Sequence, residues 1–172
     1  TMTITDSTVA DNHGTTGGGI GSERDSILNV IRSTIAGNIA DTNGGAIANV
    51  GSSSFPGGRV TIVNSTLFGN TATDSGGGIY NSLNETDVTS STIAGNSAAT
   101  GGGVAIIGGI GNLTNSLVAE NTATVDGPDV SGVFVSLGHN LVGIGDGSTG
   151  LVDGANGDHV GSGTTPIDPL LG

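Results

Sequence analysis

The stretch "NSTLFGNTATDSGGGIYN", residues Asn64 to Asn81, decides the fold, because the same order of residues returns elsewhere in the chain. Each copy has Ser-Thr, an apolar segment, an Asn, a polar turn and a glycine-rich cluster that leads into a β-branched residue. The Asn that closes the Ser-Thr segment stands at Asn12, Asn38, Asn70, Asn96 and Asn121. The steps are 26, 32, 26 and 25 residues, so the chain is a repeat array with a unit of about 26 residues.

Two apolar columns appear when the copies are aligned on the reference Asn. One column lies eight residues before it (Ile4, Val30, Ile62, Val88, Leu113) and the other three residues before it (Val9, Ile35, Leu67, Ile93, Val118). A continuous strand places same-face residues an even number apart, so a spacing of five predicts a bend between the columns. We expect exposed polar residues at this bend and inward-facing serines directly after it. The bend residues are Asp6, Arg32, Asn64, Ser90 and Asn115, and the serines are Ser7, Ser33, Ser65, Ser91 and Ser116.

Short, β-branched apolar segments indicate strands, and no stretch has the 3.6-residue period of a helix pair. The sequence therefore predicts an all-β parallel β-helix of about five to six coils, about 26 residues per coil. Residues 1–127 would form the repeat coils, and residues 128–172 a closing coil and a loop-rich segment of the same domain. The step of 32 contains "VGSSSFPGG", Val50 to Gly58, which predicts a loop excursion. Glycine clusters suit backbones that must stack closely between coils.

The reference asparagines are predicted to form a structural ladder at one corner. Their side-chain amides would hydrogen-bond up and down the axis, as they do in other stacked β structures. The ladder residues are Asn12, Asn38, Asn70, Asn96 and Asn121.

Charge and composition exclude several classes of function. The 172 residues carry a formal net charge of −12, with three arginines and no lysine, so a nucleic-acid partner is not expected. No run of 18 apolar residues predicts a membrane span. The chain opens on "TMTITDST", which has the pattern of a repeat interior, so we expect it to be part of something longer.

The "STIAGN" repeats and the "GGGI" and "GGGV" clusters, with the closing "PDVSGVFVSLGHNLVG" and "GDHVGSGTTPIDPLLG", resemble bacterial surface proteins of the choice-of-anchor Q type. "GGAI" at Gly44 to Ile47 and "LFGN" at Leu67 to Asn70 are also similar, less specifically, to the repeats of polymorphic outer-membrane adhesins. The first resemblance implies a right-handed parallel β-helix at the cell surface with no established chemistry. It suggests an extracellular structural protein, such as an adhesin that contacts surface glycans or host surfaces.

An enzymatic function is not expected. Polysaccharide hydrolases need carboxylates that converge on one face. The candidate acidic groups do not recur in a column beside an arginine. They are Asp126 with Asp129, and Asp146 with Asp153 and Asp158. His13, His139 and His159 lie in turn-like contexts and form no pair. We expect no cofactor, with one candidate metal site: Asp153, Asn156 and Asp158 have alternating spacing that could supply oxygens to Ca²⁺.

Two further functions remain open. A carbohydrate-binding or polysaccharide-degrading module would need an aromatic groove, and the aromatic residues are only Phe55, Phe68, Tyr80 and Phe134. An ice-binding face would need two outward ranks. Thr8, Thr34, Thr66 and Thr92 could form one, while the neighbouring outward column is predicted to be Ala10, Ala36, Phe68, Ala94 and Ala119.

Head-to-tail self-association is the last expectation. We predict a strand at the start of the given sequence whose outer edge could accept a strand of another chain. Its residues are Thr1, Met2, Thr3, Ile4 and Thr5. Residues 120–172 carry seven acids and no basic residue, while all three arginines lie in residues 1–60. Repulsion is therefore smaller between unlike ends, which favours a polar filament.

Overall fold

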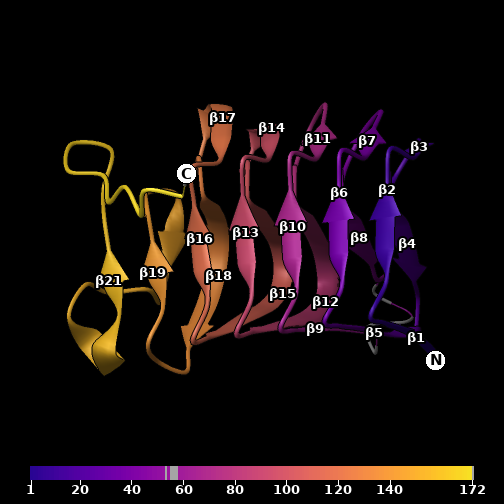
Figure 1. The fold of residues 1–172 in the computed structure, drawn as a ribbon, viewed down its shortest axis with the longest axis horizontal. Coiled ribbons are helices and arrows are strands. Elements are labelled where there is room, and N and C mark those ends of the chain that lie inside the picture. The colour runs from indigo at the N-terminus through magenta and orange to yellow at the C-terminus, as the bar shows by residue number, and fades with distance from the viewer. Residues whose placement is uncertain (53, 55–57, 172) are drawn as a thin grey trace.

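Three parallel sheets run along the axis of a β-solenoid in the computed structural model, which describes residues 1–52, 54 and 58–171 (Figure 1). Sheet A comprises β1 (Met2–Thr5), β4 (Ile20–Glu23), β5 (Ile27–Ile31), β8 (Ile47–Val50), β9 (Arg59–Val63), β12 (Ile79–Thr89), β15 (Val104–Thr114), β18 (Val130–Ser136) and β20 (Ser148–Thr149). Sheet B comprises β2 (Thr8–Ala10), β6 (Thr34–Ala36), β10 (Thr66–Phe68), β13 (Thr92–Ala94), β16 (Leu117–Ala119), β19 (Leu141–Val142) and β21 (His159–Val160). Sheet C comprises β3 (His13–Gly14), β7 (Ile39–Ala40), β11 (Thr71–Ala72), β14 (Ser97–Thr100) and β17 (Thr122–Asp126).

The register of sheet B confirms the repeat unit. Val9 pairs with Ile35, Ile35 with Leu67, Leu67 with Ile93 and Ile93 with Val118, all in parallel. Five turns therefore contain all three sheets. Two shorter closing turns follow without a sheet C strand, and a single 3₁₀ turn (Ala155–Gly157) precedes β21. The described residues contain no α-helix, and the predicted parallel β-helix is confirmed.

The bend between sheets A and B repeats in every complete turn. Asp6, Arg32, Asn64, Ser90 and Asn115 all have positive φ, between 47° and 50°. These left-handed residues turn the chain within one position, which explains the odd spacing of the two apolar columns. Ile35, Leu67 and Ile93 are fully buried in one column, and Val30, Ile62 and Val88 are buried in the other. Both predicted core columns are confirmed.

One continuous strand spans the two strands on either side of the predicted loop in the long repeat. The unbroken strand β12 pairs with β8 through Ile79–Ser82 and with β9 through Glu85–Thr89. Strands β8 and β9, on either side of the predicted loop, therefore lie in the same sheet. Residues 53 and 55–57 of the predicted loop, including Phe55, lie outside the described residues.

One predicted outward column differs in part. Ala94 and Ala119 are buried, with 1% and 0% exposure, although they face away from the core. The ring of Phe68 lies over the neighbouring rung, where a Cβ added to Gly95 would come within 2.7 Å of it. Ala119 lies beside Gly143, to which the Ile167 amide of the closing segment donates a hydrogen bond of 3.0 Å. The second rank needed for an ice-binding face is therefore covered at these two positions.

Glycine in the middle of each cluster permits close stacking of successive turns. A Cβ added to Gly77 would lie 2.5 Å from the backbone nitrogen of Ser97 and from the carbonyl oxygens of Ser97 and Gly102. Backbone cannot yield at that distance without separating two turns, so Gly77→Ala is expected to lower the free energy of unfolding by about 2–3 kcal/mol. Chemical denaturation measures this change.

Gly69→Ala is the matched control. Gly69 has φ +65° but no atom within 4 Å of an added Cβ, so the loss should be about 1 kcal/mol from backbone strain alone. Equal losses in the two variants would contradict the stacking explanation.

Candidate functional site

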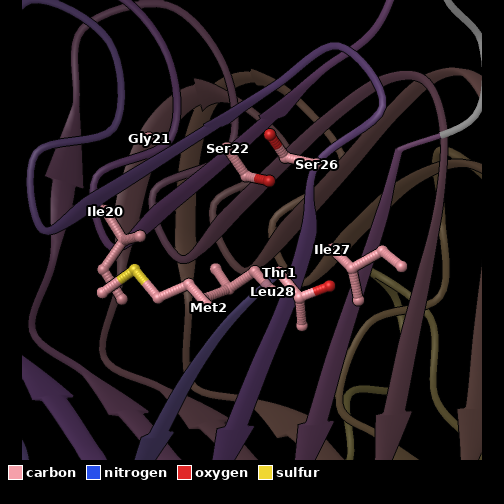
Figure 2. A pocket seen from close by; sticks show the side chains of 8 residues that line it. All are labelled: Thr1, Met2, Ile20, Gly21, Ser22, Ser26, Ile27 and Leu28. Carbon is pink, nitrogen blue, oxygen red and sulfur yellow. The ribbon is translucent and has the colours of Figure 1, made fainter.

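The first turn is hollow at its outer end. A cavity of about 220 Å³ lies there, between β1, β4, β5 and the turn before β5 (Figure 2). Its lining residues are Thr1, Met2, Ile20, Gly21, Ser22, Ser26, Ile27 and Leu28. Met2 is 55% exposed although it shares the inward face with Ile4. The Ser22 hydroxyl is buried and has no hydrogen-bond partner among the described residues. The five predicted assembly residues thus lie at an open end, where the outer edges of β1 and β4 have no partner strand in the described chain.

The five reference asparagines form one continuous stack. Asn38 Nδ2 donates to Asn70 Oδ1, and Asn70 Nδ2 donates to Asn96 Oδ1, both at 2.9 Å. The backbone amide of an asparagine in the stack donates to the same Oδ1 that accepts from its own side chain. Asn70 N, for example, donates to Asn96 Oδ1 at 2.9 Å. Asn38, Asn70 and Asn96 are fully buried, so the stack satisfies polar groups inside the solenoid.

A second ladder runs beside the first through the inward serines. The backbone amide of each serine donates to the hydroxyl of the serine in the next turn, as Ser65 N does to Ser91 Oγ at 3.1 Å. The ladder continues from Ser116 to Asn140 and then to Asp158. Its members Ser33, Ser65, Ser91 and Ser116 are buried.

Each ladder ends in a buried aspartate. Asp129 Oδ1 accepts from both the backbone amide and Nδ2 of Asn121, at 2.9 Å each, and its Oδ2 accepts from the Ile144 amide at 2.7 Å. Asp158 Oδ1 accepts from Asn140 in the same way. Each Oδ1 only accepts hydrogen bonds, whereas every other member of its ladder also donates to the following turn, so the ladder ends at the aspartate.

The sequence contained a signal for Asp129. It stands 26 residues after Gly103, in the place that a glycine or alanine takes in the earlier turns, and Val130 pairs with Val104. A Cβ added to Gly103 would lie 2.8 Å from Asn121 Nδ2, so this position faces the asparagine ladder. A carboxyl group placed there reaches the ladder directly.

The three candidate calcium ligands differ in burial and in their hydrogen-bond partners. Asp158 is buried and bonded to Asn140, while exposed Asp153 accepts from the Val160 amide at 3.0 Å. Asn156 is an exposed residue of the 3₁₀ turn, with φ 54°. In the described part of the chain, no group of three or more His, Cys, Asp or Glu side chains is arranged to hold a metal ion.

Chelation should leave the fold unchanged if Asp158 serves its ladder rather than a cation. We expect the melting temperature to be the same in millimolar calcium and in a chelator. A rise with calcium that the chelator reverses would show that the Asp153–Asp158 loop binds the ion.

The other candidate carboxylates have different surroundings. Asp126 is exposed while Asp129 is buried, and Asp146 Oδ2 accepts from the Gly163 amide at 2.8 Å. His13 Nε2 lies 2.7 Å from Asp41 Oδ1 at an exposed position.

Sequence reasoning missed a polar cluster on the outer face of sheet A. Arg59 Nε lies 2.5 Å from Asp87 Oδ2, and its Nη1 lies 3.4 Å from Glu85 Oε2. Asn112 Nδ2 donates to Glu85 Oε1 and Asp87 Oδ1, at 2.9 and 2.7 Å. The repeat step was the available signal, since Arg59 and Glu85 are 26 residues apart and pair in register. Arg59 and Asn112 donate to the two carboxylates, so the cluster links three neighbouring strands of sheet A, β9, β12 and β15.

Burial raises the pKa of the Asp129 carboxyl, against the lowering effect of the hydrogen bonds from Asn121 and Ile144. A raised pKa means that the folded state binds the proton more tightly than the unfolded state. The stabilisation linked to this group is therefore complete below its unfolded pKa and is lost as pH rises through the folded pKa.

The pH dependence of Asp129→Asn tests this sign. The variant removes the titrating group, so its stability relative to the natural chain should be more favourable at pH 7 than at pH 4, measured by denaturation at both values. The opposite trend would mean that the hydrogen bonds outweigh burial.

At the exposed bend of the first turn, the hydrogen bonds from Arg32 lower the pKa of Asp6.

Comparison with known proteins identifies one repeat. A family model described as the Chlamydia polymorphic membrane protein repeat matches residues 64–82. The match runs from the bend residue Asn64 through β10, β11 and the glycine cluster into β12, which is most of one turn. It agrees with the weaker resemblance, to polymorphic adhesin repeats, and the choice-of-anchor Q resemblance is not shown. No curated protein and no solved structure matches the chain.

The described residues contain no helix with the length and apolar character needed to cross a bilayer.

Proposed function

We propose that this chain is the β-helical body of an extracellular surface adhesin, with a structural rather than an enzymatic role. The observation that carries the proposal is the polymorphic membrane protein repeat at residues 64–82, because the same columns extend through all five complete turns. A solenoid of this kind presents extended faces on which partners can dock.

The use of the carboxylates supports a structural role. Asp129 and Asp158 end internal ladders, and Glu85 and Asp87 clamp neighbouring strands through Arg59 and Asn112. These groups stabilise the solenoid itself.

Carbohydrate binding is the second candidate, and Phe68 favours it. This ring is 55% exposed on the outer face of sheet B, beside the hydroxyl column of Thr34, Thr66 and Thr92. Aromatic faces and neighbouring hydroxyl groups are the features that a neutral sugar would contact.

An adhesion assay separates the two candidates. Beads coated with the chain are tested on host-cell monolayers and on immobilised neutral and acidic polysaccharides, while soluble reducing ends are measured. Cell attachment without sugar release supports the adhesin. Polysaccharide binding that Phe68→Ala abolishes supports the carbohydrate-binding module, and release of reducing ends would overturn the non-enzymatic role.

Surface location needs its own test. Intact cells that produce the protein are labelled with an antibody raised against the chain and treated with an external protease. Labelling that the protease removes supports the proposal. Labelling only after lysis would overturn it.

Head-to-tail assembly is proposed for the same body. The free edges of β1 and β4 and the unpartnered Ser22 hydroxyl support it, because an open sheet edge accepts a further strand. The opposite end offers β20 and β21, strands of two residues each, while both ladders have stopped at aspartates. The contact would therefore rest on backbone edges rather than on a continued asparagine ladder.

Negative-stain microscopy tests the assembly. Filaments should form at high concentration and disappear when Thr1 to Thr5 are deleted, with the remaining turns still folded by circular dichroism. A chain that stays monomeric at high concentration, with these residues intact, would rule the assembly out.

A further inference from the structure

The outer face of sheet A carries a group of exposed aliphatic side chains, here called the aliphatic patch. Its members come from β12, β15 and β18, which are neighbours in the sheet. They are Leu83, Ile107, Ile110, Val133 and Val135, with exposures of 44%, 47%, 44%, 54% and 41%. Large side chains clustered in this way on a soluble surface mark a contact with another molecule more often than scattered ones do.

The backbone is shaped to present these side chains. The pairing of β15 with β18 shifts between Ile106 and Gly111, so residues 107–110 form a bulge on the β18 side, while Ile107, Gly109 and Ile110 stay paired with β12. Gly108 and Gly109 have φ of 74° and 84°, and Leu83, which is not a glycine, has φ 61°. A left-handed leucine that also exposes its side chain is costly, and such costs are concentrated at functional positions.

Charge limits what can cover the patch. Strands β15 and β18 contain no charged residue, in a chain with a net charge of −12. Anionic membranes and nucleic acids are repelled by the molecule as a whole. On the third strand, β12, the carboxylates Glu85 and Asp87 are already bonded to Arg59 and Asn112, so they are not free to bind a basic partner. The occupant must therefore be an uncharged apolar surface, and a second copy of this chain supplies one with the same strands.

The distribution of charge sets the orientation of the second copy. Five acids against three arginines leave −2 in residues 1–60, three acids leave −3 in residues 61–119, and seven acids leave −7 in residues 120–172. Parallel copies would place the two −7 ends together. Antiparallel copies place each −7 end beside a −2 end, which holds Arg59 on the outer face of sheet A.

We propose that two copies associate side by side through the aliphatic patch, sheet A against sheet A and antiparallel, with a two-fold axis near β15. Sheet faces of this kind pack with their side chains interdigitated, and a two-fold contact uses the same patch on both copies. The dimer is distinct from the head-to-tail contact, since it needs neither β1 nor the open end.

Sedimentation equilibrium across the micromolar to millimolar range tests the dimer. Ile110→Glu and Val133→Glu should each raise the dissociation constant by roughly tenfold or more, because each places an unpaired charge on both sides of the contact. Phe68→Glu is the control, since it adds the same charge at an equally exposed apolar position on sheet B. Melting curves establish that all three variants are folded.

Cross-linking tests the orientation, because the natural chain has no cysteine. In a mixture, Thr61→Cys on β9 should form disulfides with Thr149→Cys on β20, since these strands lie two places on either side of β15 in the sheet. In separate solutions, neither variant should cross-link to itself at a comparable rate. Ile110→Cys, near the axis, should cross-link to itself.

Three results would overturn the proposal. They are a monomer at every concentration, an association that Phe68→Glu weakens as much as Ile110→Glu does, and self-cross-linking by Thr61→Cys alone. Association lost only on deletion of Thr1 to Thr5 would also overturn it, while supporting the head-to-tail contact instead.

Discussion

Replacing Leu67 by aspartate is expected to unfold the chain or to lower its free energy of unfolding by more than about 4 kcal/mol. Leu67 is fully buried and stacks between Ile35 and Ile93 in the column that sheet B contributes to the core. A carboxylate there would find no charged partner, since both neighbouring rungs present aliphatic side chains. Thermal and urea denaturation, followed by circular dichroism, measure the loss.

Thr66→Ala is the control for this substitution. Thr66 is the adjacent residue on the same strand and is exposed, so its replacement should change stability by less than about 0.5 kcal/mol. If the two variants had equal melting temperatures, the alternation of inward and outward residues along β10 would be wrong.

Replacing Asn70 by alanine is expected to lower the free energy of unfolding by about 3–5 kcal/mol. The change leaves the backbone amide and Nδ2 of Asn38 without the Asn70 Oδ1 acceptor. It also leaves the Asn96 Oδ1 and Ile35 carbonyl oxygens without the Asn70 Nδ2 donor. Each buried polar group left unpaired costs about 1–3 kcal/mol. Urea denaturation monitored at several wavelengths gives the free energy and tests whether the transition remains cooperative.

Asn12→Ala provides the comparison at the end of the same ladder. Asn12 is exposed, so water can replace the bonds it makes to Asn38, and the loss should be below about 1 kcal/mol. A uniform cost at both positions would mean that the ladder contributes through strand pairing and not through burial of its amides.

The cluster of Arg59, Glu85, Asp87 and Asn112 shows where sequence reasoning stopped short. The repeat step relates Arg59 to Glu85 and Asp87 to Asn112, by 26 and 25 residues, so the cluster could have been found by extending the column alignment. The candidate acids of the sequence analysis lie instead between Asp126 and Asp158. Of these, Asp146, Asp153 and Asp158 lie in the two closing turns, which are shorter than the repeat unit.

The repeat period by itself determined the sheets, the bend and the two buried columns. A constant step of about 26 residues places each residue beside its equivalent in the next turn, so nearest-neighbour register follows from sequence spacing alone. The same spacing brings Asn38, Asn70 and Asn96 together in one stack.

Only the tertiary structure decided the features that lie where the period fails. Asp158 meets Asn140, 18 residues earlier, because the closing turns shorten and drop sheet C. The aliphatic patch likewise depends on the bulge at residues 107–110, which has no counterpart of equal length in the neighbouring strand β18. In these places the partners of a side chain are set by the path of the backbone in space, and a periodic sequence pattern does not encode that path.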